Sequence, residues 1–251
     1  MSEILLIDGL VKHFSGLLAT DHVSLSLPAG ELHALIGPNG AGKTTLVNQL
    51  CGELQPDAGR VYFRGEDVTS TPPHERVRRG MGRTFQISSL PNEFSVHRCI
   101  ALAVSVRMSH ESKLFDSFAD RGPVWEEADA MLAESQLKAR RNVPAGELSA
   151  GERKQLELLM ALAGKPSLLL LDEPMAGLGK SESIEMVEVL QSLRGQITML
   201  LIEHDMDAVF ALADKISVLV SGRILITGSV AEIKNSDDVK LAYLGGEDEF
   251  C

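Results

Sequence analysis

The stretch "GPNGAGKTT", residues 37–45, determines how the rest of the sequence is interpreted. It fits the spacing G-x-x-x-x-G-K-[ST], with a strand-like segment "ELHALIG" before it and a helix-like segment "KTTLVNQLCG" after it. Glycines let the backbone curl so that successive N–H groups point toward phosphate oxygens, and the helix N-terminus adds its positive dipole end. The stretch therefore predicts a phosphate-binding loop between a strand and a helix.

This loop is expected to hold a nucleoside triphosphate through its backbone and two side chains. Lys43 should reach the β- and γ-phosphates, and the Thr44 hydroxyl should bind Mg²⁺. The predicted nucleotide contacts are Gly37, Pro38, Asn39, Gly40, Ala41, Gly42, Lys43, Thr44 and Thr45. The alternative is a glycine-rich turn with an exposed lysine, and the matching flanks argue against it.

A second motif, "LLLLDEP" at residues 168–174, places two acids directly after four leucines. A continuous apolar run indicates a parallel strand buried on both faces, and ligands of such sheets lie at the carboxyl ends of the strands. Asp172 is therefore predicted to hold Mg²⁺ through water, and Glu173 to act as general base on the attacking water. The alternative is a pair of acids in a solvated turn.

Strand-like and helix-like segments alternate along the chain, which predicts an α/β fold. "GRVYFRGEDV" is expected to form two strands with a turn at Gly65, and Thr71 followed by Pro72 should begin a helix. From about residue 87 to 146 the strand pattern stops, and "VHRCIALAVSVR" and "VWEEADAMLAESQL" predict helices. Strands return with "SLLLLDEP", "ITMLLIEHD" and "KISVLVSGRILITG", so a mostly helical lobe interrupts the α/β core.

Composition limits the possible partners. The net charge of −11 argues against a nucleic-acid partner bound through a general basic surface. The start "MSEILLIDGL" does not fit a signal peptide, and no apolar run approaches the ~20 residues that span a bilayer. Three scattered cysteines suit a reducing cytoplasm. Any membrane association is therefore expected through a partner.

The stretch "LSAGE" at residues 148–152, with the order of the motifs around it, resembles the signature of ATP-binding cassette (ABC) proteins. The resemblance covers residues 4–244 and implies a P-loop NTPase core with an antiparallel β subdomain. A helical lobe at about residues 87–164 would be inserted in that core, and residues 245–251 would form an acidic tail. It also implies that Gln86 contacts Mg²⁺, that His204 contacts the γ-phosphate and positions water, and that Phe14 stacks on adenine.

In this family two cassettes pack head to tail around two ATP molecules. The resemblance implies that Ser149, Gly151 and Glu152 meet the γ-phosphate bound by the other subunit, as an anion at a helix N-terminus. An apolar stripe on the same helix should fasten it to the lobe, and its members are Leu156, Leu159, Met160 and Ala163.

Three positions depart from the family pattern. The signature commonly reads LSGGQ, whereas this chain has Ala150 and Glu152, and the charge of Glu152 puts its ATP contact in doubt. The stretch "AGLG" at residues 176–179 replaces the usual SALD, so Gly179 lacks a side chain that links the two sites of the dimer. A cassette that binds ATP without hydrolysing it, in a regulatory or scaffold role, is therefore an alternative.

Finer features resemble the branched-chain amino acid importer ATPases: "RTFQ", "AGL", "IEHDM" and "AYLG". That likeness implies transmembrane permease subunits, a second ATPase that is the same or unlike, an external binding protein, and a place on the cytoplasmic face of the membrane. The lipopolysaccharide-export ATPase and the urea and amide importers are similar. The segment 87–96 is expected either to form part of the groove that receives the permease or to be an ordinary surface loop. The transported substrate stays open.

Overall fold

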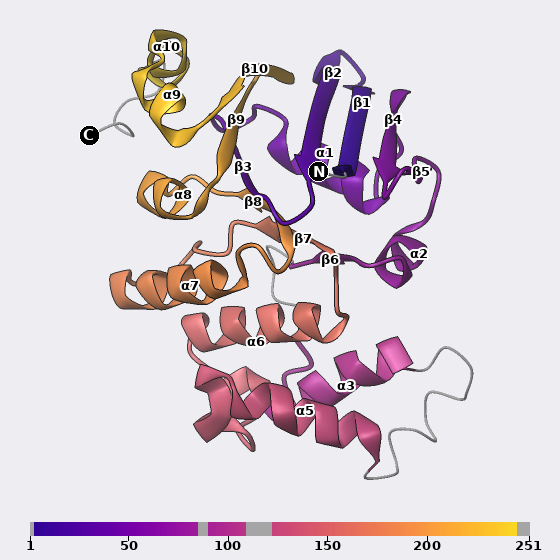
Figure 1. Ribbon diagram of the computed structural model, residues 1–251, viewed down its shortest axis with the longest axis vertical. Helices are drawn as coiled ribbons and strands as arrows, with labels where there is room; N and C mark the ends of the chain where they lie inside the picture. Colours follow the sequence, from indigo (N-terminus) through magenta and orange to yellow (C-terminus); the bar gives the residue numbers. More distant parts are fainter. Residues whose placement is uncertain (1–2, 85–89, 109–121, 245–251) are drawn as a thin grey trace.

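The computed structural model describes residues 3–84, 90–108 and 122–244, and its centre is a six-stranded sheet (Figure 1). The strand order is β10-β9-β3-β8-β7-β6, and every neighbouring pair is parallel except the β9–β10 hairpin. The strands are β3 (Leu32–Ile36), β6 (Met81–Arg83), β7 (Leu168–Asp172), β8 (Thr198–Ile202), β9 (Lys215–Val220) and β10 (Arg223–Gly228).

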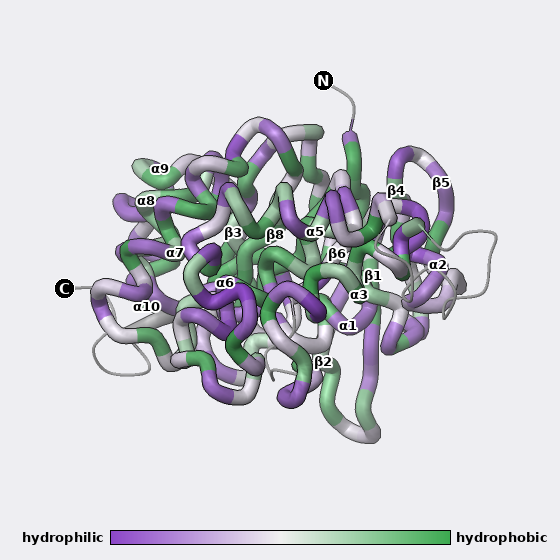
Figure 2. The backbone as a smooth tube through the Cα atoms, turned by 90° about the horizontal axis from the view of Figure 1, so that it is seen from below, coloured by the Kyte–Doolittle hydropathy of each residue, from purple (hydrophilic) through white to green (hydrophobic). Residues whose placement is uncertain are grey.

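The central strands are buried on both faces, as their unbroken apolar runs predict. Along β7, Leu168 and Leu170 pack into one hydrophobic core and Leu169 and Leu171 into another, following the two-residue period of a strand. In Figure 2, where the tube is coloured by residue hydropathy, β3 and β8 are mostly hydrophobic and lie inside the molecule.

One face of this sheet packs against α1 (Lys43–Cys51), which a second, antiparallel sheet covers in turn. That sheet has the order β2-β1-β4-β5 and lies at the upper end of the view in Figure 1. Its strands are β1 (Glu3–Phe14), β2 (Leu17–Pro28), β4 (Ala58–Phe63) and β5 (Glu66–Asp67). Leu46 and Leu50 of α1 share this core with Leu5 and Ile7 of β1, so the antiparallel sheet is tied to the phosphate-loop helix.

The other face is covered by helices that follow the later strands. They are α7 (Lys180–Leu193), α8 (Met206–Leu212), α9 (Val230–Asn235) and α10 (Asp237–Leu244). Met186 and Leu190 of α7 and Val209 and Leu212 of α8 are buried in the same core as Ile36 of β3. The result is the predicted α/β fold with an antiparallel sheet on one side.

The chain between β6 and β7 leaves the sheet and returns to a neighbouring strand, and its described part is helical. The helices are α3 (Val96–Met108), α5 (Pro123–Ala133), η1 (Gln136–Arg140), η2 (Ala145–Glu147) and α6 (Ala150–Ala163). They gather at the lower end of Figure 1 around a core of their own. Leu156 and Ala163 of the predicted stripe are buried in this core, with Leu159 and Met160 packed against it. The lobe bounds of 87–164 stay a prediction.

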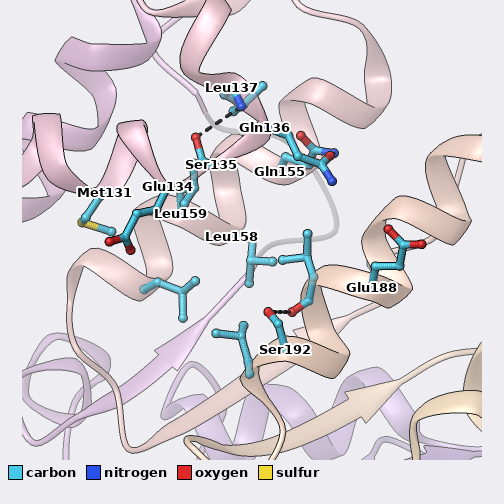
Figure 3. A pocket seen from close by; sticks show the side chains of 13 residues that line it. Met131, Glu134, Ser135, Gln136, Leu137, Gln155, Leu158, Leu159, Glu188 and Ser192 are labelled. Carbon is cyan, nitrogen blue, oxygen red and sulfur yellow. Dashed lines mark hydrogen bonds between the residues drawn. The ribbon is translucent and has the colours of Figure 1, made fainter.

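The lobe meets the sheet domain where α6 faces α7, and a cavity of about 440 Å³ lies at this junction (Figure 3). Leu158 and Leu162 line it from α6, and Leu193 lines it from α7. At its edge the Gln155 side chain donates to the Gln136 side chain across 2.7 Å, as the two lie together in Figure 3. The junction is thus apolar inside with a hydrogen-bonded rim.

Two helix boundaries differ from the sequence prediction. The helix α2 (Pro73–Arg78) begins one residue later than expected, because Pro72 rather than Thr71 takes the N-cap position. The expected single helix over "VWEEADAMLAESQL" ends at Ala133, because the Ser135 hydroxyl accepts from the Leu137 N–H and starts a separate 3₁₀ turn. In the described ranges, no helix combines the length and the apolarity that crossing a bilayer requires.

Candidate nucleotide-binding site

The carboxyl ends of four neighbouring parallel strands carry the predicted motifs. β3 leads into the loop 37–42, β8 into His204, β7 into Glu173, and β6 into the segment that begins at Thr84. Because parallel strands end at one edge of a sheet, these loops lie side by side. Gln86, the remaining predicted ligand, lies outside the described residues.

Two glycines of the phosphate loop are required by close backbone contacts. Gly37 has a φ of 155°, and a Cβ atom there would lie 2.1 Å from the Leu219 carbonyl oxygen. Gly42 has a φ of 107°, and a Cβ atom would lie 2.2 Å from the Ala19 carbonyl oxygen. Such distances exclude any side chain, so the loop is held between β2 and β9 in one shape.

The start of α1 is suited to an anion. Its N-cap is Gly42, which has no side chain to occupy the first N–H groups, and no acid lies in its first turn. The Lys43 ammonium donates to the carbonyl oxygens of Gly37 and Pro38 within the loop. It therefore lies folded across the loop. Asn39, Gly40 and Thr44 are exposed, Pro38 and Thr45 are half-buried, and Ala41 is buried.

The acidic pair after β7 differs in environment from one residue to the next. Asp172 is 2 % exposed, and burial raises the pKa of its carboxyl, whereas the Arg83 guanidinium at 3.2 Å opposes that rise. Glu173 is half-buried and has a φ of 51°, which is strained for a residue with a side chain. Its N–H donates to the Ile202 carbonyl oxygen at 2.9 Å, and this bond ties the strained turn to β8.

His204 follows β8 beside a buried acid that sequence reasoning missed. Its side chain is 54 % exposed, and its N–H donates to Glu203 Oε2 at 3.0 Å. Glu203 Oε1 accepts from the Met175 N–H at 2.7 Å, two residues beyond Glu173. Burial raises the pKa of the Glu203 carboxyl. Glu203 thus joins the loop of the predicted base to the loop of the predicted switch histidine.

Phe14 lies at the tip of the β1–β2 hairpin, opposite Leu17. It is 45 % exposed, and the Lys12 ammonium lies 6.0 Å from its ring centre. Further along β2, the Ala19 carbonyl borders Gly42 of the phosphate loop. An exposed aromatic ring at the end of β1, in the hairpin whose second strand borders the loop, is suited to stacking on a base.

The signature stretch forms the N-terminus of α6, with Ser149 as its N-cap. The Ser149 hydroxyl accepts from the Glu152 N–H at 3.2 Å, and the Glu152 carboxylate accepts from the Ser149 N–H at 2.9 Å. This reciprocal pair is a capping box, and Arg140 also binds Glu152. The unusual Glu152 therefore stabilises its own helix. Ala150 is exposed at the first helical position.

A carboxylate from α7 already occupies the start of this helix. Glu182 Oε1 accepts from the Ser149 hydroxyl at 3.3 Å and from the Gly151 N–H at 3.2 Å. A Cβ atom on Gly151 would lie 2.6 Å from that oxygen, so the close approach depends on glycine. The donors predicted to bind a phosphate do hold an anion, supplied by the same chain. The sequence pattern gave no signal for Glu182.

Gly179 is the N-cap of α7, and the other oxygen of Glu182 accepts from its N–H at 3.1 Å. Its φ of −75° and ψ of 166° suit any residue. An added Cβ atom would lie 3.8 Å from Glu182 Oε2, its nearest neighbour. The missing side chain at this position therefore reflects no steric need of the described structure.

A groove of about 460 Å³ lies between the sheet domain and the lobe. α2 and β6 form one wall, and α3 and α6 form the other. Val77 and Val106 face it and are 52 % and 54 % exposed. Both carboxylate oxygens of Glu157 are buried there without a hydrogen-bond partner among the described residues. Leu90, from the segment 87–96, also lines this groove.

A glycine loop at a helix N-terminus, acids after a buried strand and a histidine after the next strand together define a nucleotide-binding cassette of the P-loop class. Comparisons with known proteins agree. The family described as ABC transporter matches residues 20–176. The "High-affinity branched-chain amino acid transport ATP-binding protein LivG" of Salmonella typhimurium is 36 % identical over 261 residues, covering 98 % of this chain and 99 % of the relative.

Two further comparisons extend this likeness. The "Lipopolysaccharide export system ATP-binding protein LptB" of Acidithiobacillus ferridurans is 33 % identical over 98 % of this chain and 99 % of its own length. The solved ADP conformation of MJ1267, an ATP-binding cassette of an ABC transporter, has a TM-score of 0.85 and 33 % identity, covering 98 % of this chain and 100 % of that chain. The chain belongs to the ABC transporter family, as an ATP-binding subunit with ATPase function.

Proposed function

We propose that this ATPase subunit powers the import of branched-chain amino acids or related amides through separate permease subunits in a membrane. The support for the substrate class is the 36 % identity to LivG over 98 % of the chain. Export of lipopolysaccharide is the second candidate function, and its support is the 33 % identity to the lipopolysaccharide-export relative. The chain would lie on the cytoplasmic face, and an external binding protein would deliver the substrate.

The observation that carries the catalytic part is the meeting of the phosphate loop, Glu173 and His204 at one sheet edge. The loop and Lys43 bind the phosphates, and Phe14 stacks on the adenine. Glu173 accepts a proton from the attacking water as its oxygen approaches the γ-phosphorus. His204 contacts the γ-phosphate and orients that water.

Mg²⁺ fits the residues of this site. The Thr44 hydroxyl and the Asp172 carboxylate are hard oxygen donors of the kind that Mg²⁺ prefers. Asp172 ends β7, and Thr44 lies in the first turn of α1, which follows β3 of the same sheet. Gln86 is the third proposed ligand. When bound, the ion neutralises negative charge on the β- and γ-phosphates.

We infer that two cassettes form the working unit, packed head to tail. Ser149 and Gly151 of one cassette would donate to the γ-phosphate held by the other, in the place that Glu182 Oε1 fills in the single chain. The partner is a second copy or an unlike ATPase. Hydrolysis would remove the shared anion and release the two cassettes.

The groove between α2, β6, α3 and α6 is the proposed docking site for the permease. Its exposed valines suit an apolar helix face. The buried Glu157 carboxylate lacks a partner among the described residues and would accept from a basic or amide side chain of that helix. ATP-driven closing and opening of the two cassettes would reach the permease through this contact.

Glu173→Gln tests the catalytic proposal. The ATPase rate of the purified chain is measured alone and mixed with a candidate partner ATPase, and the dimer fraction is measured by size exclusion with ATP. The variant should lose at least about 100-fold in kcat because the general base is absent, and it should accumulate as an ATP-dependent dimer. Glu188→Gln, an exposed change on α7, serves as control.

An undiminished rate in Glu173→Gln would reject Glu173 as base. ATP binding without any dimer would reject the head-to-tail arrangement. The substrate class is tested with permease and binding protein reconstituted in vesicles. ATPase stimulation by leucine-loaded binding protein supports import, and stimulation by lipopolysaccharide supports the export candidate.

A further inference from the structure

Arg83 connects three parts of the molecule at the nucleotide edge. Its Nη2 donates to Asp172 Oδ2 at 3.2 Å, and its Nη1 donates to Glu53 Oε2 at 2.8 Å. Glu53 follows the C-cap of α1, the helix that begins at the phosphate loop. One planar guanidinium therefore joins the predicted metal ligand to the far end of the phosphate-loop helix.

The backbone of Arg83 is fixed relative to Asp172. Arg83 is paired with Leu170 in the parallel ladder between β6 and β7, and the next N–H, that of Thr84, donates to the Leu170 carbonyl oxygen at 2.9 Å. Its side chain is 11 % exposed. The guanidinium thus contacts Asp172 from the neighbouring strand, whose backbone is held by the ladder between β6 and β7.

The contact selects one carboxylate oxygen. Arg83 binds Oδ2 of Asp172, and this restricts the rotation of a side chain that is itself 2 % exposed. Partners that orient a metal ligand in this way commonly change metal affinity 10- to 100-fold when they are removed. Lysine could supply the same charge to Asp172 but could not hold Glu53 and Asp172 together in one plane.

We propose that Arg83 is a positioning residue that orients the Asp172 carboxylate for the divalent cation, an inference that rests on the nucleotide site proposed above. Arg83 also lines the permease groove beside Val77 and Val106. The Arg83 side chain therefore forms part of the groove wall and also contacts Asp172, the predicted metal ligand.

The test measures how much Mg²⁺ strengthens nucleotide binding. The dissociation constant of a fluorescent non-hydrolysable ATP analogue is determined in EDTA and in excess Mg²⁺, and the ratio of the two values reports the metal contribution. Arg83→Lys should lower this ratio about tenfold and leave the value in EDTA unchanged. Glu53→Gln, at a half-exposed position, should lower the ratio in the same direction but less.

Two controls separate the possible results. Arg78→Lys alters an exposed arginine that lines the same groove, and it should leave the ratio unchanged. Asp172→Asn should abolish the metal contribution. An unchanged ratio in both Arg83→Lys and Glu53→Gln, with the loss in Asp172→Asn, overturns the role of Arg83 and leaves the proposed metal site intact. An unchanged ratio in Asp172→Asn overturns the metal site and the role of Arg83 together. If Arg83→Lys also lost binding of the ATP analogue in EDTA, Arg83 would be required for folding only, and its positioning role would be rejected.

Discussion

Single residues at this site are set by backbone geometry as much as by side-chain chemistry. Glu173 keeps a left-handed φ of 51°, held by its N–H bond to the Ile202 carbonyl. Such strain persists only where the surroundings enforce it, and it is concentrated at functional positions. Gly179 is the opposite case, because its extended backbone accepts any side chain.

The open position of Gly179 leads to a stability prediction. Gly179→Ser should raise the free energy of unfolding by a few tenths of a kcal/mol, because serine is a better N-cap than glycine. Gly177→Ser should lower it by about 1–2 kcal/mol, because Gly177 has a φ of 80°. Thermal denaturation of both variants checks the pair. If Gly179→Ser destabilised the chain as much as Gly177→Ser, the absence of a side chain at Gly179 would be a requirement of the fold, and the prediction would be wrong.

At the scale of elements, one carboxylate serves two helix starts. Glu182 accepts from Gly179 at the start of α7 and from Ser149 and Gly151 at the start of α6. The N–H of Gly179 is the largest cause that lowers the pKa of this carboxyl, and the Gly151 N–H and the Ser149 hydroxyl lower it further. Its contribution to folding is present above the unfolded pKa near 4.5 and is lost as the pH falls through the lower folded pKa.

Glu182→Gln should therefore flatten the dependence of stability on pH below about 5, since a neutral amide does not titrate. The measurement is the midpoint of thermal unfolding from pH 7 to pH 3.5, compared with the wild type. Glu188→Gln, an exposed change on the same helix, should keep the wild-type slope. If the unfolding midpoint fell equally with pH in the wild type and in Glu182→Gln, other acids would dominate the loss of stability in acid.

At the scale of the whole molecule, the nucleotide site joins parts that are distant in sequence. The phosphate loop lies against Ala19 of β2 and Leu219 of β9, so the antiparallel sheet and the C-terminal strands both support it. A ligand bound there should stabilise the folded chain as a unit. Saturation at about 100 times Kd adds about 2.7 kcal/mol.

That free energy corresponds to a rise of about 5–10 °C in the unfolding midpoint for a chain of this size. Differential scanning calorimetry with and without ATP and Mg²⁺ measures it. Lys43→Ala should lose most of the shift, because the ammonium that would reach the phosphates is absent. A full shift in Lys43→Ala would place the nucleotide away from the phosphate loop.

Much of the fold could be predicted because its signals are local. The run at Leu168 to Leu171 is apolar at every position, which indicates a strand buried on both faces. Gly52 takes the left-handed C-cap that ends α1, as its place after the helical pattern predicts. The predicted N-cap at Thr71 was wrong by one residue, because Pro72 is the N-cap and Pro73 is the first helical residue. Proline is compatible with both of these positions, so the two consecutive prolines did not fix the start of the helix.

Residues that act across the fold could not be predicted in the same way. Arg83 and Glu203 lie inside the stretches "RTFQ" and "IEHDM", but no sequence spacing indicates their side-chain contacts or those of Glu182. The partners of Arg83, Glu203 and Glu182 lie 89, 28 and 31 residues away. Glu152, in contrast, was identified only as a departure from the signature. Its S-x-x-E spacing from Ser149 is typical of a capping box, and the structure has both hydrogen bonds of that box.

The sequence by itself determined the phosphate loop, the buried strand that ends in Asp172 and Glu173, and the family, because these depend on residues adjacent in the chain. Only the tertiary structure decided that Glu182 holds the donors of the signature helix and that Arg83 joins Asp172 to Glu53. The physical reason is that such contacts depend on strand order and helix packing. Charged side chains meet there through the folded sheet rather than through spacing along the chain.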